Sequence, residues 1–327
     1  MKKIVYRQFG PPHEVLRVEE APDAPLEAGQ IRVEVLAAPI HPADLLQVAG
    51  NYGVRPELPA TPGSEGVGRV IESQAPSHAV GQTVLLSAGG GSWRDQLVGP
   101  AAAFVPLPNG IDPQQLAMLT VNPLTAHLML SVFDDLQPGD WVLQSAANST
   151  VGGYVVQLAK HRGLRTINVV RRESAVAALQ DLGADVTLLD GPDLATRIKE
   201  SVGDGHARLA LDAVGGSTFE RLADALGQSG TIVSYGVLSG EGGSLSPGAL
   251  VFNDVRARGF WLSKWFQEAS PAEIQAAFSE LVPLVAQGVL RGRVAGTYTL
   301  EQIEQAVTHA AQDSKDGKVL LVRGGSA

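Results

Sequence analysis

The sequence predicts an α/β protein of two domains, one rich in short strands and one built on a doubly wound parallel sheet. Three observations lead to this fold class. The chain has 327 residues, which is enough for about two domains of ordinary size. Residues 1–120 hold short strand-like runs divided by Pro and Gly, whereas residues 141–235 alternate apolar strands with short helices. Such alternation is typical of βαβ units, whose parallel strands are covered by helices on both faces.

Residues 1–120 are expected to form the strand-rich domain. Residues 31–35 (IRVEV) alternate apolar and polar side chains, as in a strand with one buried face. Prolines recur from Pro39 to Pro108, so no long helix is expected in this part of the chain. Further strands are expected at 66–71 and 83–86, and one short helix at 43–48.

Residues 121–256 are expected to form the parallel-sheet domain. Helices at 114–119 and 125–133 are expected around its start. The strands of the sheet are expected at 141–143, 166–170, 186–189, 209–212 and 231–235, and the helices between them at 152–161, 173–182, 195–202 and 217–226.

The alternation ends near residue 256, and residues 257–327 are expected to return to the first domain. Helices are expected at 271–287 and 300–311, followed by a last strand at 317–322. A strand at the end of the chain needs a sheet to join, and the strand-rich first domain offers one.

Composition and charge exclude several classes of protein. The net charge of −9 argues against general nucleic-acid binding, which needs a basic face. The absence of Cys removes disulfides and Cys-based zinc sites, and the 7 histidines show no metal-ligand spacing, so no metal is expected. No apolar run is long enough to span a membrane. The sequence starts directly with a strand-like run and shows no signal or transit features, so a cytoplasmic location is expected.

A turn of small residues follows the first strand of the predicted sheet. Residues 144–153 read QSAANSTVGG and lead directly into a helix. At this place in a doubly wound sheet, the N–H groups and the positive end of the helix favour a pyrophosphate. Gly152 and Gly153 are the only glycines of the turn, and the hydroxyls of Ser149 and Thr150 could donate to phosphate. The alternative is a plain turn between strand and helix.

Two arginines end the next strand and favour NADP(H) as the cofactor. A site for the non-phosphorylated cofactor has Asp or Glu about 20 residues after the turn, where it binds the ribose. Here that distance leads to Arg171 and Arg172, within the run NVVRRE at 168–173. Two guanidinium groups can hold a 2′-phosphate in bidentate fashion. The alternative is a solvated arginine pair at the start of a helix.

Several longer stretches resemble the zinc-independent branch of the medium-chain dehydrogenase/reductase superfamily, and within it the 2-enoyl thioester reductases. The most specific are GNYG at 50–53 and RGFWLSKW at 258–265, which are closer to enoyl reductases than to general quinone reductases. Other matching stretches are 37–44, 56–59, 63–66, 121–126, 136–140, 147–149 and 164–171. The resemblance covers nearly the whole chain.

This resemblance implies a GroES-like β-rich catalytic domain, an inserted Rossmann domain, NADPH as cofactor and a homodimer. The catalytic tyrosine of the family maps to Tyr52. The cofactor contacts map to Asn122, Asn148, Ser149, Thr150, Val151, Gly152, Arg171, Arg172, Tyr235, Gly236, Val237, Leu238, Phe260, Trp261, Leu262 and Lys318. The chain departs from the family at His41, where relatives usually carry Asn, at Thr150, which replaces Gly, and at Glu173, where relatives often have another Arg.

The implied reaction is the NADPH-dependent reduction of the C2=C3 double bond of a trans-2-enoyl thioester, carried by CoA or by acyl-carrier protein. A tyrosine hydroxyl is protonated at neutral pH, so Tyr52 can donate a proton or stabilise the developing oxyanion. Lys318 is expected either to pair with a phosphate or to cap a solvated strand. The alternatives are an NADPH:quinone oxidoreductase of the same superfamily and a protein that binds NADPH without turnover.

Overall fold

The structure is a computed structural model that describes residues 1–23, 25–86, 88–313 and 315–324. The chain divides into two compact units. The first unit combines Met1–Val121 with Arg291–Ala327, and the second unit is Asn122–Leu290. Each unit has its own sheet, and the α/β fold class predicted from the sequence is confirmed.

The first unit is built on a mixed sheet whose strands come from both ends of the chain. Its order is β14-β15-β3-β4-β5-β7, and β6 also pairs with β3. The strands are β3 (Gln30–Pro39), β4 (Val67–Ser73), β5 (Thr83–Leu85), β6 (Gln96–Pro100), β7 (Val105–Pro106), β14 (Val294–Tyr298) and β15 (Lys318–Val322), and a separate hairpin joins β1 (Lys2–Val5) to β2 (Arg17–Glu20). The helices are α1 (Pro12–Val15), α2 (Pro42–Val48), α3 (Pro113–Ala117) and α11 (Ile303–Ala310), with short 3-10 turns at Ala101–Ala103 and Leu300–Gln302.

The core of the first unit explains why the end of the chain returns to it. Strand β15 pairs antiparallel with β3, with Leu321 opposite Ala38. Val319 and Leu321 are buried in the same apolar cluster as Ile31 and Val33 of β3. The last strand therefore completes a core that the first strands begin.

The second unit is built on a six-stranded parallel sheet of order β10-β9-β8-β11-β12-β13. The strands are β8 (Trp141–Gln144), β9 (Arg165–Val170), β10 (Val186–Leu189), β11 (Ala207–Asp212), β12 (Thr231–Ser234) and β13 (Arg256–Gly259). The helices are α4 (Asn122–Val132), α5 (Thr150–His161), α6 (Val176–Leu182), α7 (Leu194–Val202), α8 (Gly216–Ala225), α9 (Leu262–Glu268) and α10 (Pro271–Ala286), with a 3-10 turn at Glu173–Ala175 and a π-helical turn at Gly248–Phe252.

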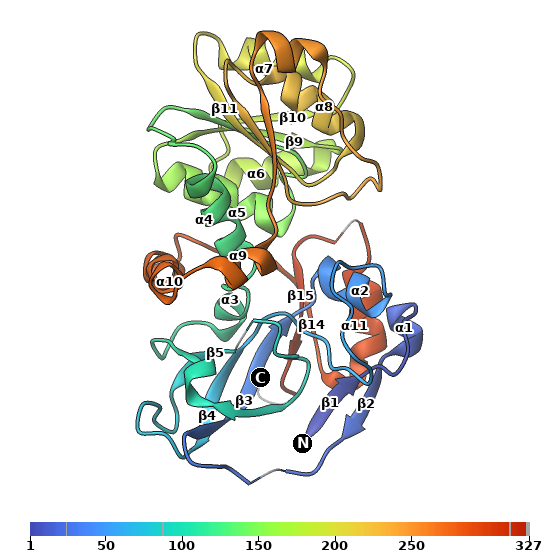
Figure 1. Cartoon of the computed structure of the whole chain (residues 1–327), viewed down its shortest axis with the longest axis vertical. Coiled ribbons are helices and arrows are strands. Elements are labelled where there is room, and N and C mark those ends of the chain that lie inside the picture. The colour runs from blue at the N-terminus through green and yellow to red at the C-terminus, as the bar shows by residue number, and fades with distance from the viewer. Residues whose placement is uncertain (24, 87, 314, 325–327) are drawn as a thin grey trace. The chain divides into compact units, whose positions relative to one another are not determined.

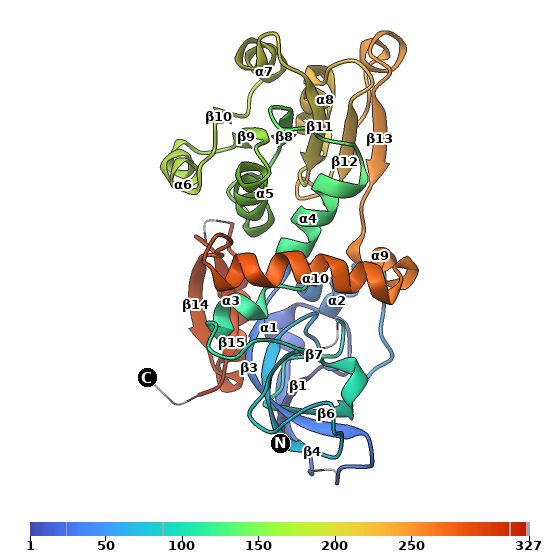
Figure 2. The same ribbon diagram turned by 90° about the vertical axis from the view of Figure 1, so that its left-hand side faces the viewer.

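Helices cover both faces of this sheet, as a doubly wound fold requires. Helices α5 and α6 lie on one face, and α7 and α8 lie on the other (Figures 1 and 2). The apolar strand residues that predicted the sheet, such as Leu143, Ile167 and Ile232, are fully buried between these layers. Because all strands are parallel, their carboxyl ends meet at one edge of the sheet, where the connecting loops are free to carry function.

The chain re-enters the first unit at Arg291, later than the residue 257 expected from the sequence. The reason is β13, which pairs with β12 along its whole length, with Thr231 opposite Arg256. Its sequence, RARG, has no apolar alternation and all four residues are exposed, so only the backbone pairing identifies it as a strand. Residues 257–290 therefore belong to the second unit.

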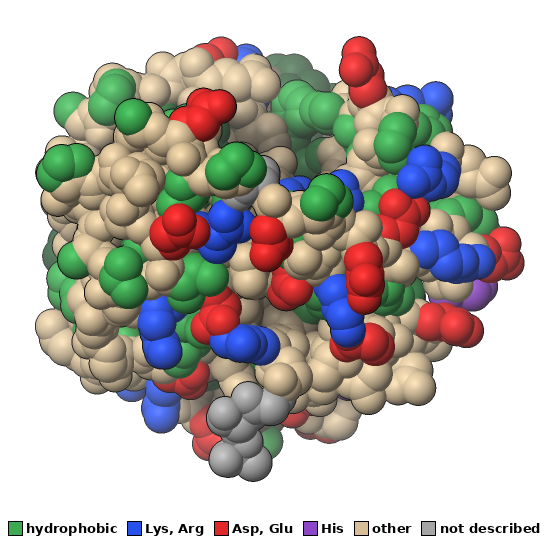
Figure 3. Space-filling view, turned by 90° about the horizontal axis from the view of Figure 1, so that it is seen from below, with side chains coloured by type: hydrophobic (Ala, Val, Ile, Leu, Met, Phe, Trp, Pro, Cys, Tyr) green, Lys and Arg blue, Asp and Glu red, His purple; other side chains and the backbone are tan. Residues whose placement is uncertain are grey.

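Acidic and basic side chains are mixed on the face of the molecule shown in Figure 3. In the first unit, ion pairs join Arg32 to Glu72 and Arg293 to Asp316. The net negative charge is thus not gathered into one patch on that face.

Candidate active site

Tyr52 lies on a loop of the first unit that follows helix α2, and its side chain is half-buried. Arg55 closes this loop, because its Nε and Nη2 donate to the carbonyl oxygen of Gly50 at 2.9 and 2.5 Å. The same guanidinium group lies over the ring of Phe9, 5.6 Å from its centroid. Gly50 has a φ of +77°, and a Cβ added there would lie 3.0 Å from Cβ of Phe9. Tyr52 is thus carried by a loop fixed on both sides.

The turn after β8 forms a tight entrance to helix α5 in the second unit. Ser149 caps this helix, because its Oγ accepts from the N–H of Gly152 at 3.1 Å. A Cβ on Gly152 would lie 2.4 Å from the carbonyl oxygen of Ala147, so only glycine fits there. Ala146 has a φ of +47°, in the left-handed region. Helix α5 begins at Thr150, so the N–H groups of Thr150 and Val151 lie at its positive end, where an anion would be favoured.

Buried polar side chains hold this turn to the neighbouring strands, and the sequence reasoning missed them. Nε2 of Gln144 donates to the carbonyl oxygen of Gly152 at 3.1 Å and to Oδ1 of Asn168 at 2.7 Å. Oγ of Ser145 donates to Oδ1 of Asp212 at 2.7 Å. All four side chains are completely buried at the carboxyl ends of β8, β9 and β11. The signal was available, because Gln144, Asn168 and Asp212 are polar residues within otherwise apolar strands.

Arg171 and Arg172 follow the carboxyl end of β9 and are exposed. Strand β9 is the direct neighbour of β8, with Asn168 opposite Gln144. The arginines are therefore three and four residues beyond the register position of Gln144, at the same edge of the sheet as the turn. Glu173, the departure from the family pattern, begins the 3-10 turn that follows them.

Residues 235–238 form the loop after β12 at this same edge. The N–H of Tyr235 donates to the carbonyl oxygen of Asp212 at 2.9 Å, and that of Leu238 donates to the carbonyl oxygen of Ala213 at 2.9 Å. A Cβ on Gly236 would lie 3.0 Å from the same Ala213 oxygen. Val237 and Leu238 are exposed. This loop follows the neighbouring β11 loop closely and presents two apolar side chains to solvent.

The phenol of Tyr235 stays protonated at neutral pH. Burial raises the pKa of Tyr235, the carboxylate of Asp212 raises it further, and Ser149 lowers it in part. Because Ser149 belongs to the turn before α5, the phenol lies beside that turn. The Tyr235 hydroxyl is a neutral, buried group that has no partner within ordinary hydrogen-bond geometry among the described residues.

Asn122 is an unpaired donor at the start of α4. Its side chain is only 2% exposed, and its Nδ2 has no hydrogen-bond partner among the described residues. A buried donor without a partner is costly, so it marks a position for an acceptor from a ligand. Asn148 is exposed in the turn before α5.

The aromatic residues after β13 divide between packing and exposure. The ring of Phe260 lies edge-to-face with that of Phe133 at 6.1 Å, and its N–H donates to the carbonyl oxygen of Ser234 at 2.9 Å. Trp261 is 41% exposed, and Leu262 begins helix α9 half-buried. Trp265 packs edge-to-face with Phe266 at 5.1 Å.

Lys318 does not cap a solvated strand, which was one of the two expectations for it. Its side chain is 5% exposed, and its Nζ lies 3.2 Å from Nδ1 of His41. The local sequence shows only a lysine at the start of a strand. Lys318 is buried because residues far away along the chain, such as His41, pack against it. A contact between Lys318 and a phosphate of the cofactor stays a prediction.

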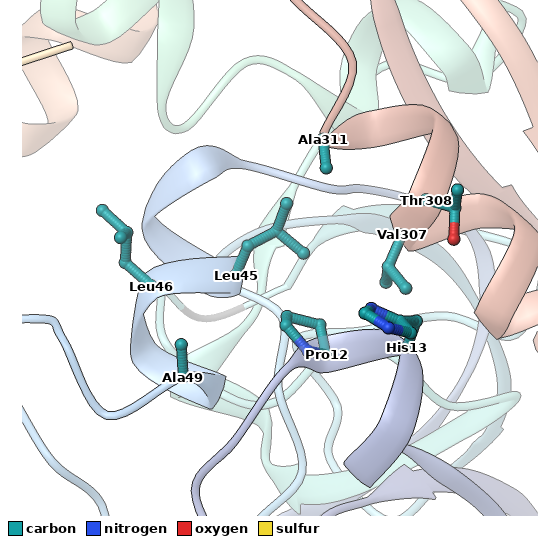
Figure 4. Close-up of a pocket in the computed structure, with 8 residues that line it drawn as sticks. All are labelled: Pro12, His13, Leu45, Leu46, Ala49, Val307, Thr308 and Ala311. Carbon is teal, nitrogen blue, oxygen red and sulfur yellow. The ribbon is translucent and has the colours of Figure 1, made fainter. Parts of the chain in front are cut away.

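The first unit also contains an apolar groove of about 430 Å³ between α1, α2 and α11 (Figure 4). It is lined by Pro12, His13, Leu45, Leu46, Ala49, Val307, Thr308 and Ala311. No predicted site residue lines it.

In the part of the chain that the structure describes, no three His, Asp or Glu side chains are grouped so that they could hold a metal ion. Among the same residues, no helix is both long and apolar enough to cross a membrane.

Comparison with known proteins matches both units. Residues 27–109 match the family described as alcohol dehydrogenase GroES-like domain, and residues 150–286 match the family described as zinc-binding dehydrogenase. The mitochondrial enoyl-acyl-carrier-protein reductase of Rattus norvegicus is 38% identical over 315 residues, which cover 94% of this chain and 84% of that protein. The mitochondrial location in that name differs from the cytoplasmic location expected here, which stays a prediction.

Two solved structures are similar over almost the whole chain. A complex of Etr1p with NADP and crotonyl-CoA has a TM-score of 0.90 and 26% identity, covering 98% of this chain and 99% of that one. A protein from Bacillus thuringiensis, named as a candidate NADPH:quinone reductase, has a TM-score of 0.89 and 32% identity, covering 98% of each chain.

The two glycines of the turn give a matched test of the dinucleotide site. We expect Gly152→Ala to weaken NADPH binding at least about tenfold, because the added methyl group meets the Ala147 backbone and displaces the start of α5. Gly153→Ala is the control, since its methyl group would meet only Cδ1 of Leu182, at 3.3 Å. Fluorescence titration with NADPH measures both. Equal affinities for the two variants would contradict the assignment of the turn.

Proposed function

The chain belongs to the medium-chain dehydrogenase/reductase superfamily and is an oxidoreductase, and from this premise we propose that it catalyses NADPH-dependent reduction of the C2=C3 double bond of a trans-2-enoyl thioester. One observation carries the proposal: the similarity to an enoyl-acyl-carrier-protein reductase, at 38% identity, extends over 94% of the chain. The thioester carrier is CoA or acyl-carrier protein.

The second unit has a set of groups that fits NADPH. The N–H groups at the start of α5 would bind the pyrophosphate, and the guanidinium groups of Arg171 and Arg172 would bind the 2′-phosphate. The buried Nδ2 of Asn122 would donate to an acceptor on the cofactor, which supplies the partner that this atom lacks within the described chain. The remaining residues of this unit proposed for the cofactor come from the loops around Tyr235 and Phe260. When bound, NADPH supplies the hydride that adds to the β-carbon of the substrate.

Tyr52 would act on the thioester itself. Addition of hydride to the β-carbon places negative charge on the carbonyl oxygen and the α-carbon. The phenol can donate a hydrogen bond to that oxygen or a proton to that carbon. The fixed loop between Gly50 and Arg55 supports this role, since a donor held in place needs no reorganisation during the reaction.

A second candidate is NADPH:quinone reduction, which the similarity to the Bacillus thuringiensis protein favours. It needs the same fold and the same cofactor site, so fold alone does not distinguish the two activities. Oxidation of NADPH followed by absorbance with crotonyl-CoA, a longer trans-2-enoyl-CoA and a quinone in parallel separates them. Turnover with the quinone alone would replace the first proposal by the second.

We also propose that the chain forms a homodimer through the edge of its parallel sheet. Among the described residues, β13 pairs with β12 on one side only, and it is exposed along its length. Next to it in the chain, Leu250, Val251 and Phe252 are 50%, 72% and 77% exposed. An open strand edge beside an apolar patch is a typical place for association.

Tyr52→Phe tests the catalytic role directly. We expect kcat for crotonyl-CoA to fall about 10²- to 10⁴-fold, the range typical for loss of a general acid, while the Kd for NADPH is unchanged. Tyr298→Phe is the matched control in the same unit, since its hydroxyl pairs with His309. A Tyr52→Phe enzyme that turns over as fast as the control would remove Tyr52 from the mechanism.

The paired variant Arg171→Ala/Arg172→Ala tests the choice of cofactor. Charged hydrogen bonds contribute about 1.5–3 kcal/mol each, so loss of both guanidinium groups should raise KM for NADPH about 100-fold and leave KM for NADH nearly unchanged. Lys199→Ala, on α7 of the same unit, is the control for a lost surface charge. An equal rise in KM for NADPH and NADH would show that the two arginines do not bind the 2′-phosphate.

Val251→Glu tests the proposed dimer. A carboxylate in an apolar contact is costly, so we expect the particle mass in light scattering to change from dimer to monomer. Val80→Glu is the control, because Val80 is 66% exposed in the first unit. A dimer that persists in the Val251→Glu protein would contradict this interface.

A further inference from the structure

The first unit contains a buried polar cluster that the proposed reaction leaves unexplained. It consists of His41, Asp44, Ser64, Glu65 and Lys318. His41, Asp44, Glu65 and Lys318 are 4%, 1%, 0% and 5% exposed. Four side chains that can carry charge are rarely buried together in a small volume unless they are paired.

His41 lies between Glu65 and Lys318 and contacts both. Its Nε2 lies 2.7 Å from Oε1 of Glu65, and its Nδ1 lies 3.2 Å from Nζ of Lys318. A lysine ammonium group can only donate, so Nδ1 must accept. The ring proton is then on Nε2 and is donated to the Glu65 carboxylate, which leaves His41 neutral. Burial lowers the pKa of His41, and Lys318 lowers it further, in agreement with this assignment.

The cluster holds two backbone segments in place. Oδ2 of Asp44 accepts from the N–H of His41 at 2.8 Å, which fixes the first turn of α2, and Asp44 also accepts from the hydroxyl of Ser64. Oε2 of Glu65 accepts from the N–H of Val121 at 2.7 Å. Both anchored segments lead to proposed site residues, since Asn122 follows Val121 directly.

Helix α2 carries this anchoring to the loop with Tyr52. The helix has only seven residues, so its position depends strongly on how its first turn is held. At its other end, the N–H of Asn51 donates to the carbonyl oxygen of Leu46 at 2.8 Å, and Tyr52 is the next residue. A shift at His41 would therefore be transmitted through one short helix to the phenol.

The cluster lowers the stability of the fold in the neutral pH range. Burial lowers the pKa of Lys318 to about 8, with Lys315 acting in the same direction and Glu65 and Asp44 opposing it. The unfolded chain then binds more protons between pH 8 and 10.5, so folding stability from this group is lost as pH falls through about 8.

The contribution of the carboxyl groups to stability changes with pH in the opposite direction to that of Lys318. Burial raises the pKa of Asp44 to about 6, against the bonds from Ser64 and His41 and the charge of Lys318. Its contribution to stability is therefore lost as pH rises from 3.8 through about 6. Burial also raises the pKa of Glu65. Burial raises the pKa of the Tyr6 phenol, and the nearby carboxylate of Asp44 raises it further. A cluster that is unfavourable for stability near neutral pH calls for another purpose.

We propose that His41 is a positioning residue of the reductase reaction, because it joins Lys318 to Glu65 and thereby holds α2 and the Tyr52 loop in place. This inference rests on the proposed function. His41 touches neither substrate nor cofactor in this role and acts through the helix and the loop.

Two substitutions of His41 separate positioning from simple filling of space. Asn has the same pattern as the neutral ring, with one acceptor for Lys318 and one donor for Glu65, although its reach is shorter. Leu fills a similar volume and offers neither. We expect His41→Asn to keep kcat within about threefold and His41→Leu to lose about 10- to 100-fold, the loss typical of a displacement of about 1 Å in an active site. His13→Leu, exposed in the same unit, is the control.

The pH profile adds a readout that a filler of space would not change. In the wild type, kcat should fall above about pH 8, because Lys318 then loses its proton and its hydrogen bond to His41 is no longer strengthened by charge. In His41→Leu Lys318 has no ring nitrogen to bond to, so this alkaline limb should be absent. His41→Asn should keep the limb of the wild type.

Hydrogen exchange of residues 42–51 tests the positioning without any substrate. Exchange in this segment should rise in His41→Leu and not in His41→Asn, while β4 stays protected in both. All variants are assayed with whichever acceptor the wild type reduces, so a wild type inactive on enoyl-CoA overturns the proposed function alone. A His41→Leu protein with unchanged kcat, alkaline limb and exchange would overturn the role of His41, as would equal losses in both variants.

Discussion

The carboxyl edge of the parallel sheet depends on polar side chains that are buried and joined across strands. Gln144 and Asn168 connect β8 to β9, and Ser145 and Asp212 connect β8 to β11. A buried polar group without a partner costs stability, so these pairs permit only one register of the three strand ends. The turn before α5 and the loop with Tyr235 both bond to members of this network, which therefore fixes the surface proposed for the cofactor.

In the first unit, the corresponding connections between distant segments are made by buried side chains that can carry charge. Glu65 and Lys318 are 253 residues apart in sequence, and His41 joins them with a ring that accepts on one side and donates on the other. The amides of Gln144 and Asn168 do not titrate, whereas His41, Glu65 and Lys318 all can, so the hydrogen bonds of this cluster change strength with pH.

Much of the fold could be predicted from the sequence, because hydrophobic periodicity reports which strands are buried on both faces. The βα alternation between residues 141 and 235 predicts the parallel sheet, and the observed strands agree with it to within a few residues. Strand β13 could not be found in this way, since its residues are exposed and only its backbone pairs. Because β13 was not predicted, the chain was expected to return to the first unit at residue 257, whereas it returns at Arg291.

The candidate site shows the same division between local and long-range information. The turn at Gly152 and the arginines after β9 could be predicted, because the strand, turn and helix that form this part of the site are consecutive in the chain. Lys318 carries no such signal: its local pattern is that of a polar residue at a strand start, and its burial follows from a contact with His41 across 277 positions. In the proposed reaction the proton or hydrogen-bond donor, the hydroxyl of Tyr52, lies on a loop. A loop is not fixed by hydrogen bonds to neighbouring strands. Tyr52 therefore depends on the cap of α2 and on the closure by Arg55, so residues that never meet the substrate determine where its hydroxyl lies.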